Sequence, residues 1–110
     1  MNDNQITYTE GVTMYTSIRR YTSDPHEVEG IIKLAQQGDI NERIGGLPGF
    51  VAYYMINCGA GVLATVSVFD DQAGAERSNA VAADWVRENV LPSYSISAPK
   101  ITAGEVVLSI

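Results

Sequence analysis

The segment from Gly49 to Phe69 constrains the fold of this chain more than any other. Its sequence, GFVAYYMINCGAGVLATVSVF, contains two apolar stretches separated by a glycine-containing turn. The stretches at about 50–56 and 62–69 predict two strands, and residues 57–61 supply the positive-φ positions that a hairpin needs. The sequence therefore predicts a β-hairpin, with a helical pattern on each side of it.

A strand and a helix precede the hairpin. Residues 13–21 mix β-branched and aromatic side chains, which predicts a strand. A helix then begins at Asp24-Pro25 and extends to Gly45-Gly46, with a kink or break near Gly38. Asp24 stands three residues before Glu27, which is the spacing of a capping box.

A second helix and a last strand follow the hairpin. Asp70 or Asp71 caps a helix that runs to about Val90, and residues 101–110 form a strand that pairs beside the first one. The residues of this helix that we predict to face the core are Ala75, Asn79, Ala82, Val86 and Val90. The order strand, helix, strand, strand, helix, strand predicts an α+β, ferredoxin-like βαββαβ domain with a four-stranded antiparallel sheet. We assign residues 14–110 to it and residues 1–13 to an N-terminal extension, either an edge strand near 6–9 or a disordered segment.

Composition limits the partners and the compartment. The formal net charge of −6 over 110 residues leaves no basic stripe for phosphates, so nucleic acid and anionic membranes are not expected partners. A single cysteine, Cys58, excludes an internal disulfide framework and provides no zinc site by itself. The first dozen residues lack the pattern of a secretory signal, and no segment has the apolar length of a membrane span. We expect a cytoplasmic protein without a metal or cofactor.

The strands are apolar on both faces. In the hairpin, Tyr53 and its neighbour Tyr54 must point to opposite sides of the sheet, because side chains alternate along a strand. Both alternating sets of residues are nevertheless rich in aliphatic and aromatic side chains. A sheet with one solvated face would alternate apolar and polar residues. Because the helices cover only one face, we predict a homodimer in which a second copy covers the other.

These segments resemble the antibiotic biosynthesis monooxygenase-like proteins of the dimeric α+β barrel superfamily. The resemblance rests on residues 47–54 (LPGFVAYY), 66–71 (VSVFDD) and 73–76 (AGAE), and it covers about residues 14–109. It implies a dimeric α+β barrel, and a substrate held between sheet and helices by polar and aromatic side chains without metal or flavin. The superfamily includes cofactor-independent oxygenases, haem-degrading enzymes and many small proteins without known chemistry.

The resemblance makes Asn79 the best match to a catalytic residue, because it lies on the apolar line of the second helix. An internal hydrogen bond to backbone or a strand hydroxyl is the favoured alternative for Asn79. Trp85 is predicted on the flank of that helix, where packing or a dimer contact is the alternative to catalysis. Arg19 completes the predicted catalytic set; its alternative is a salt bridge, with Glu105 as a possible partner.

Five residues are predicted to bind substrate: Tyr15, Tyr53, Tyr54, Ser67 and Phe69. Neighbouring side chains of a strand point to opposite faces of the sheet, so only one of Tyr53 and Tyr54 can face the helices. Haem-binding members of the superfamily have a tryptophan at the position of Phe69, and they have a histidine on the second helix. The second helix of this chain contains no histidine. The only histidine, His26, is predicted to be exposed at the start of the first helix.

Two functions remain open from the sequence. The first is a cofactor-independent monooxygenase of a small electron-rich aromatic, such as a quinol or a polyketide-like compound. The second is a non-catalytic dimer that binds a small apolar ligand or serves as an interaction module, with its interior filled by side chains. An isomerase or decarboxylase activity is a weaker third alternative, since one fold supports varied chemistry.

Overall fold

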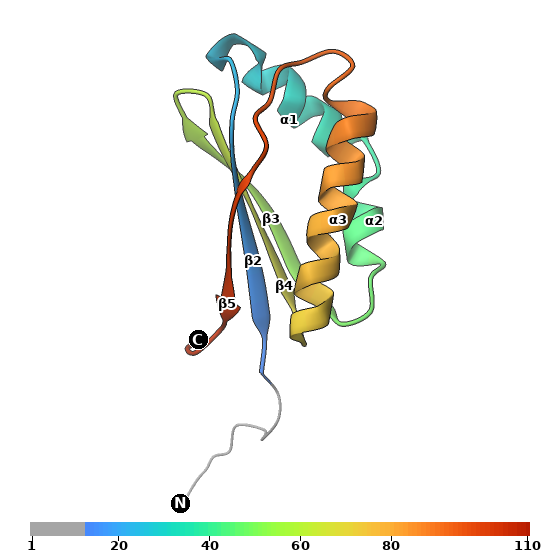
Figure 1. The fold of residues 1–110 in the computed structure, drawn as a ribbon, viewed down its shortest axis with the longest axis vertical. Coiled ribbons are helices and arrows are strands. Elements are labelled where there is room, and N and C mark those ends of the chain that lie inside the picture. Colours follow the sequence, from blue (N-terminus) through green and yellow to red (C-terminus); the bar gives the residue numbers. More distant parts are fainter. Residues whose placement is uncertain (1–12) are drawn as a thin grey trace, which may run out of the picture.

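The computed structural model describes residues 13–110. Its elements, labelled as in Figure 1, are the strands β2 (Tyr15–Thr22), β3 (Phe50–Gly59), β4 (Val62–Phe69) and β5 (Lys100–Glu105), the 3-10 turn η1 (Pro25–Glu27), and the helices α1 (Val28–Gln37), α2 (Ile40–Gly45) and α3 (Gln72–Asn89). The edge strand considered near residues 6–9, and almost all of the predicted extension 1–13, lie outside the described residues.

The four strands form one antiparallel sheet in the order β3-β4-β2-β5, with the helices on one face (Figure 1). The predicted ferredoxin-like fold is confirmed, as is the break between α1 and α2 at Gly38. Two strand ends differ from prediction: β3 continues to Gly59 instead of Ile56, and β5 stops at Glu105 instead of Ile110. Among residues 13–110, no helix is long and apolar enough to cross a membrane.

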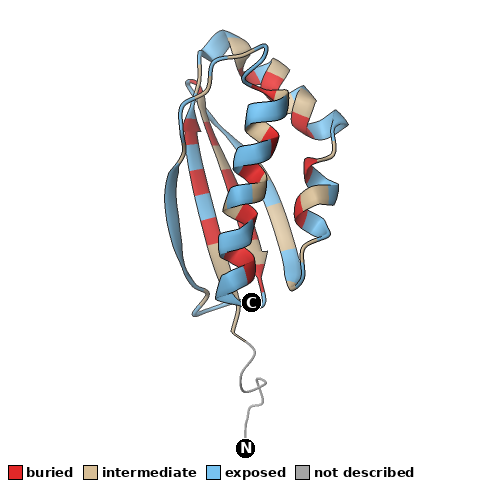
Figure 2. Ribbon diagram, turned by 45° about the vertical axis from the view of Figure 1, so that its right-hand side comes forward, coloured by how far each residue is buried: buried red, intermediate tan, exposed pale blue. Residues whose placement is uncertain are grey.

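The core lies between the sheet and the helices. Figure 2 shows buried positions alternating with less buried ones along two strands and following one side of the long helix α3. The buried hydrophobic residues are Tyr21, Val28, Ile31, Ala35, Ile40, Ile44, Leu63, Phe69, Ala75, Ala82, Trp85 and Val90. Alternation along β2 and β4 follows from the two-residue period of a strand, since only one face meets the helices.

Helix α3 starts where the sequence predicts, but it is rotated from the predicted orientation. The Asp71 side chain accepts a hydrogen bond from the Gly74 backbone N–H at 2.7 Å, which caps the helix. Trp85 is only 4% exposed, so its predicted place on the flank is wrong. The deepest row contains Ser78 and Trp85, and Asn79 lies beside it, half-buried.

The predicted capping box does not form. Asp24 Oδ1 accepts from the backbone N–H of His26 at 2.8 Å, two residues on. The Glu27 carboxylate instead accepts from the backbone N–H of Ser95 at 2.7 Å. Glu27 therefore joins the start of the first helical segment to the loop between α3 and β5, and His26 is exposed, as predicted.

The β3–β4 part of the sheet face opposite the helices is apolar, as predicted, whereas β2 contributes Thr16, Arg20 and Thr22 to this face beside Ile18. The exposed apolar side chains of this face include Ile18 at 37%, Tyr54 at 59% and Ile56 at 44% exposure. The half-buried members of the same face are Ala52, Val62, Ala64, Val66 and Val68. We call these eight residues the open sheet face; none of the described helices covers it (Figure 1).

Candidate functional site

Arg19 lies at the centre of the helix-facing side of the sheet. It belongs to β2, an inner strand that pairs with both β4 and β5. Alternation along β2 turns Ser17, Arg19 and Tyr21 toward the helices and leaves Arg20 exposed. Arg19 is only 1% exposed, which is rare for a charged side chain.

The guanidinium of Arg19 donates four hydrogen bonds, all to neutral side chains. Nε donates to Thr65 Oγ1 at 3.0 Å, and Nη2 donates to Ser67 Oγ at 2.6 Å, both on β4. Nη1 donates to Ser78 Oγ at 3.1 Å and to Asn79 Oδ1 at 2.7 Å, both on α3. Arg19 thus connects three elements, and each of its nitrogens has an acceptor.

Within residues 13–110, no carboxylate forms an ion pair with Arg19. The predicted salt bridge to Glu105 is wrong, because Glu105 lies opposite Tyr15 in the register and is exposed. Desolvation lowers the pKa of Arg19 from its ordinary value. A buried cation without a counter-charge favours an anion or an electron-rich group beside it.

Asn79 bonds within the protein. Its Oδ1 accepts from Ser17 Oγ at 2.6 Å in addition to Arg19. This agrees with the favoured interpretation of an internally bonded amide. Ser78 also has two partners, because its Oγ donates to the Ala75 carbonyl oxygen at 2.6 Å while accepting from Arg19. The network is therefore held rigidly between β2 and α3.

Two tyrosines lie near Arg19: Tyr21, which is buried, and Tyr53, which is half-buried. Burial raises the pKa of Tyr21 and of Tyr53, and the positive charge of Arg19 opposes part of each shift. Tyr53 is thus the member of the tyrosine pair that faces the helices. Tyr54 lies on the open sheet face, so it does not contact the interior predicted to hold substrate.

A small cavity lies between the sheet and the helices, beside Tyr21, Tyr53 and Thr65, with apolar side chains forming most of its wall. Its volume is about 30 Å³, enough for a water-sized molecule, whereas a cavity known to hold benzene has about 150 Å³. Trp85 also lines it, and its indole Nε1 is buried without a hydrogen-bond partner in the described part of the chain.

The structure brings together some of the predicted site residues and separates others. Arg19, Asn79 and Ser67 form one network, with Tyr53 nearby. Tyr15 and Phe69 pair at the other end of the sheet, and neither lines the cavity. Phe69 is fully buried and packs edge-on against Phe50, with ring centroids 5.8 Å apart.

Sequence reasoning missed four members of the site: Ser17, Tyr21, Thr65 and Ser78. Ser17 and Tyr21 share the parity of Arg19 on one strand, so period-two reasoning could have found them. Thr65 required the register of β4 against β2, which no local pattern states. Among the described residues, no group of three or more His, Cys, Asp or Glu side chains could hold a metal ion.

Comparison with known proteins identifies the fold. No protein-family model matches the chain, and no curated protein matches it. A solved protein of unknown function from Nitrosomonas europaea superposes with a TM-score of 0.72 at 16% identity, over 91% of this chain and 95% of that one. A candidate antibiotic biosynthesis monooxygenase from the same organism gives a TM-score of 0.67 at 14% identity, over 92% and 96%.

A third similar structure is a dimeric ferredoxin-like protein from an uncultured marine organism. Its TM-score is 0.65 at 14% identity, and the match covers 89% of this chain and 97% of that one. At these sequence identities the structural similarity supports a shared fold and not a shared chemistry. The chain has the ferredoxin-like α+β fold of the antibiotic biosynthesis monooxygenase-like proteins, as the resemblance in its sequence implies.

Proposed function

We propose that this protein binds a small electron-rich aromatic compound between its sheet and helices and promotes the oxidation of that compound by O₂ without a cofactor. The observation that carries the proposal is the buried charge of Arg19, which has no ion-pair partner among residues 13–110 and lies beside Tyr21, Tyr53 and Thr65, three residues that line the cavity. Such a site favours the ionised form of a phenol or quinol, because an anion supplies the missing counter-charge.

The protein would supply position and electrostatics, and the substrate would supply the electrons. In the oxidation of an anthrone, for example, one atom of O₂ becomes the new carbonyl oxygen and the other leaves as water, taking up the two hydrogens of the methylene group. Arg19 stabilises the substrate anion, and the phenols of Tyr21 and Tyr53 donate hydrogen bonds to its oxygen. Exclusion of water strengthens each of these interactions.

A second candidate function is a non-catalytic dimer that binds a small ligand or a partner protein. Two observations favour it: the cavity of about 30 Å³ and the internal hydrogen bonds of Asn79. The two functions differ in one requirement, because an oxygenase must enlarge this interior to admit a ring.

The deciding experiment is O₂ uptake by purified, metal-free protein with a panel of anthrones and hydroquinones. We expect saturable uptake that falls at least about tenfold in Arg19→Met, since loss of one charge-stabilising group commonly costs that much or more. Arg77→Met is the matched control, because Arg77 is exposed on α3 and lies outside both the Arg19 network and the open sheet face. Uptake no faster than the spontaneous rate across the panel would favour the non-catalytic function.

We further propose that two copies associate through the open sheet face. Its exposed Ile18, Tyr54 and Ile56 form an apolar surface that no helix among residues 13–110 covers, and a similar solved protein is dimeric. Sedimentation should give the mass of a dimer for the wild type and of a monomer for Tyr54→Glu. Leu91→Glu is the control, because Leu91 is equally apolar and 51% exposed but lies beyond the end of α3. A dimer that survives Tyr54→Glu would argue against this interface.

A further inference from the structure

The internal cavity shares a wall with a groove on the surface. The groove has a volume of about 130 Å³ and lies between the α1–α2 segment and β3. The side chains that line both spaces are Ala35, Ile40, Tyr53 and Met55. Ile40 is the first residue of α2, and Met55 lies on β3, an edge strand of the sheet. Only this layer of side chains separates the cavity from the groove.

Helix α2 is a short element with a break at each end. It has six residues and lies between Gly38 and Gly46. A Cβ at Gly38 would lie 2.7 Å from the Leu34 carbonyl oxygen, which is too close, and 3.7 Å from Trp85 Nε1, which is ordinary contact, so the break at Gly38 lies next to the indole. An element so short is not stable on its own and depends on its tertiary contacts.

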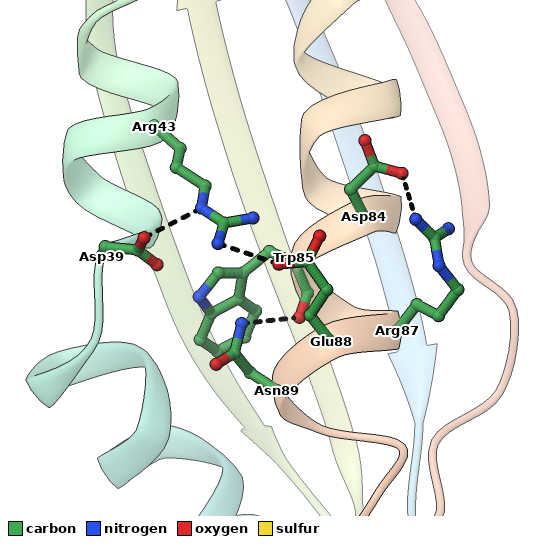
Figure 3. A network of polar contacts seen from close by, with 7 residues as sticks. All are labelled: Asp39, Arg43, Asp84, Trp85, Arg87, Glu88 and Asn89. Carbon is green, nitrogen blue, oxygen red and sulfur yellow. Dashed lines mark hydrogen bonds and ion pairs between the residues drawn. The ribbon is translucent and has the colours of Figure 1, made fainter.

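One polar contact ties α2 to α3 from outside. Arg43 Nη2 on α2 lies 2.9 Å from Glu88 Oε1 on α3, and Arg43 Nε also pairs with Asp39 at 3.0 Å. Figure 3 shows this bridge beside the Trp85 indole. The pair is partly exposed, with 32% of the Arg43 side chain and 49% of the Glu88 side chain accessible. Pairs of this kind contribute little, so the bridge biases a local opening whose main cost is the exposure of Ile40 and Ile44, which are 3% and 0% exposed when α2 is in place.

We propose that α2 is a movable wall of the cavity and that ligands reach the interior from the β3 edge. Displacement of α2 removes Ile40 from the shared layer and joins the groove to the cavity, and the Arg43–Glu88 bridge favours the closed position. Ile40 and Met55 then determine the size of the ligand that passes. The proposal deepens the proposed function and rests on it for the identity of the ligand, because an aromatic ring needs more than the closed volume.

The test uses Trp85 as its probe, because it is the only tryptophan of the chain and it lines the cavity. Quenching of its fluorescence lifetime by acrylamide measures how often a small polar molecule reaches the indole. We compare wild type, Glu88→Ala and Asp84→Ala. Asp84→Ala is the matched control: it removes the same charge from the same helix and breaks the 2.7 Å pair with Arg87, which lies away from α2 (Figure 3).

We expect the quenching constant to rise about twofold or more in Glu88→Ala and to stay at the wild-type value in Asp84→Ala. Equal constants in all three proteins, or an equal rise in both variants, would overturn the proposal. Thermal unfolding followed by far-UV circular dichroism checks that both variants are folded. No substrate is present, so a failure here is distinct from a failure of the oxidation assay: either result can occur without the other.

Discussion

The buried charge of Arg19, which has no ion-pair partner among residues 13–110, leads to a prediction about stability that reverses the usual expectation for conservative substitutions. Arg19→Lys keeps the charge, whereas Arg19→Met removes it at similar length. We expect Arg19→Lys to destabilise the protein more than Arg19→Met does. Both variants remove the same planar group from the same buried position on β2, so their difference weighs the desolvation cost of the charge against the hydrogen bonds that an ammonium keeps.

The magnitude follows from the hydrogen bonds. The guanidinium reaches acceptors on β4 and α3 through three nitrogens, and a single ammonium at one point loses at least two of the four bonds. At about 1.5–3 kcal/mol for each bond to a charged group, Arg19→Lys costs about 3–6 kcal/mol. The lysine ammonium is also still buried, so this variant keeps the desolvation cost of the charge.

Arg19→Met loses all four bonds but also removes the desolvation cost, which is several kcal/mol for a buried ion. Two of the four acceptors it leaves keep another partner: Asn79 keeps its bond from Ser17, and Ser78 keeps its bond to the Ala75 carbonyl. We therefore expect Arg19→Met to lie within about 2 kcal/mol of the wild type.

Urea unfolding at pH 7, followed by far-UV circular dichroism at one fixed protein concentration, measures both free energies of unfolding. Arg77→Lys and Arg77→Met are the controls at an exposed position of α3, where changes within about 0.5 kcal/mol are expected. An Arg19→Lys variant as stable as the wild type, or more stable than Arg19→Met, would refute the claim that this charge is buried at a cost.

Three further predictions concern pH, capping and packing. Burial raises the pKa of Tyr53 above its ordinary value of 10.0, so the folded state keeps a proton that the unfolded state loses. The free energy of unfolding should thus fall as pH rises above about 10, and less steeply in Tyr53→Phe; equal slopes in urea titrations would contradict this. Asp71→Ala should cost about 1 kcal/mol in the same titrations, since it removes the cap on Gly74 N–H. Gly74→Ala should cost about 1–3 kcal/mol, because its Cβ would lie 2.7 Å from the buried Phe69 ring; no change in the unfolding midpoint would show that the ring moves freely.

Local patterns were sufficient to predict the fold. The hairpin, the helix that Asp71 caps and the interruption at Gly38 depend on residues close together in the chain, and each is present. The element order then leaves few topologies for a sheet covered by helices on one face. The end of β5 was missed because residues 106–110 keep a strand-like composition after their pairing with β2 has ended.

The site was harder to predict, because it depends on contacts between distant segments. Asn79 and Arg19 were recognised separately, but their mutual hydrogen bond joins residues 60 positions apart. Trp85 was misplaced because α3 carries apolar side chains on two adjacent rows, and the pattern alone does not say which row faces the sheet. The absence of a carboxylate beside Arg19, noted for residues 13–110, is visible only once the strands are in register.

The polar layer around Arg19 also bears on how the strands find their alignment. Strand β4 is apolar on both faces outside Thr65 and Ser67, so a slip of two residues against β2 would bury nearly as much hydrocarbon. Such a slip would set Arg19 opposite Leu63 or Ser67 in place of Thr65 and would disrupt its paired hydrogen bonds to the two hydroxyls, which is costly for a buried guanidinium. The Arg19 guanidinium, whose burial costs free energy, therefore also disfavours the misaligned sheet. A chain without it would have several strand pairings of similar free energy.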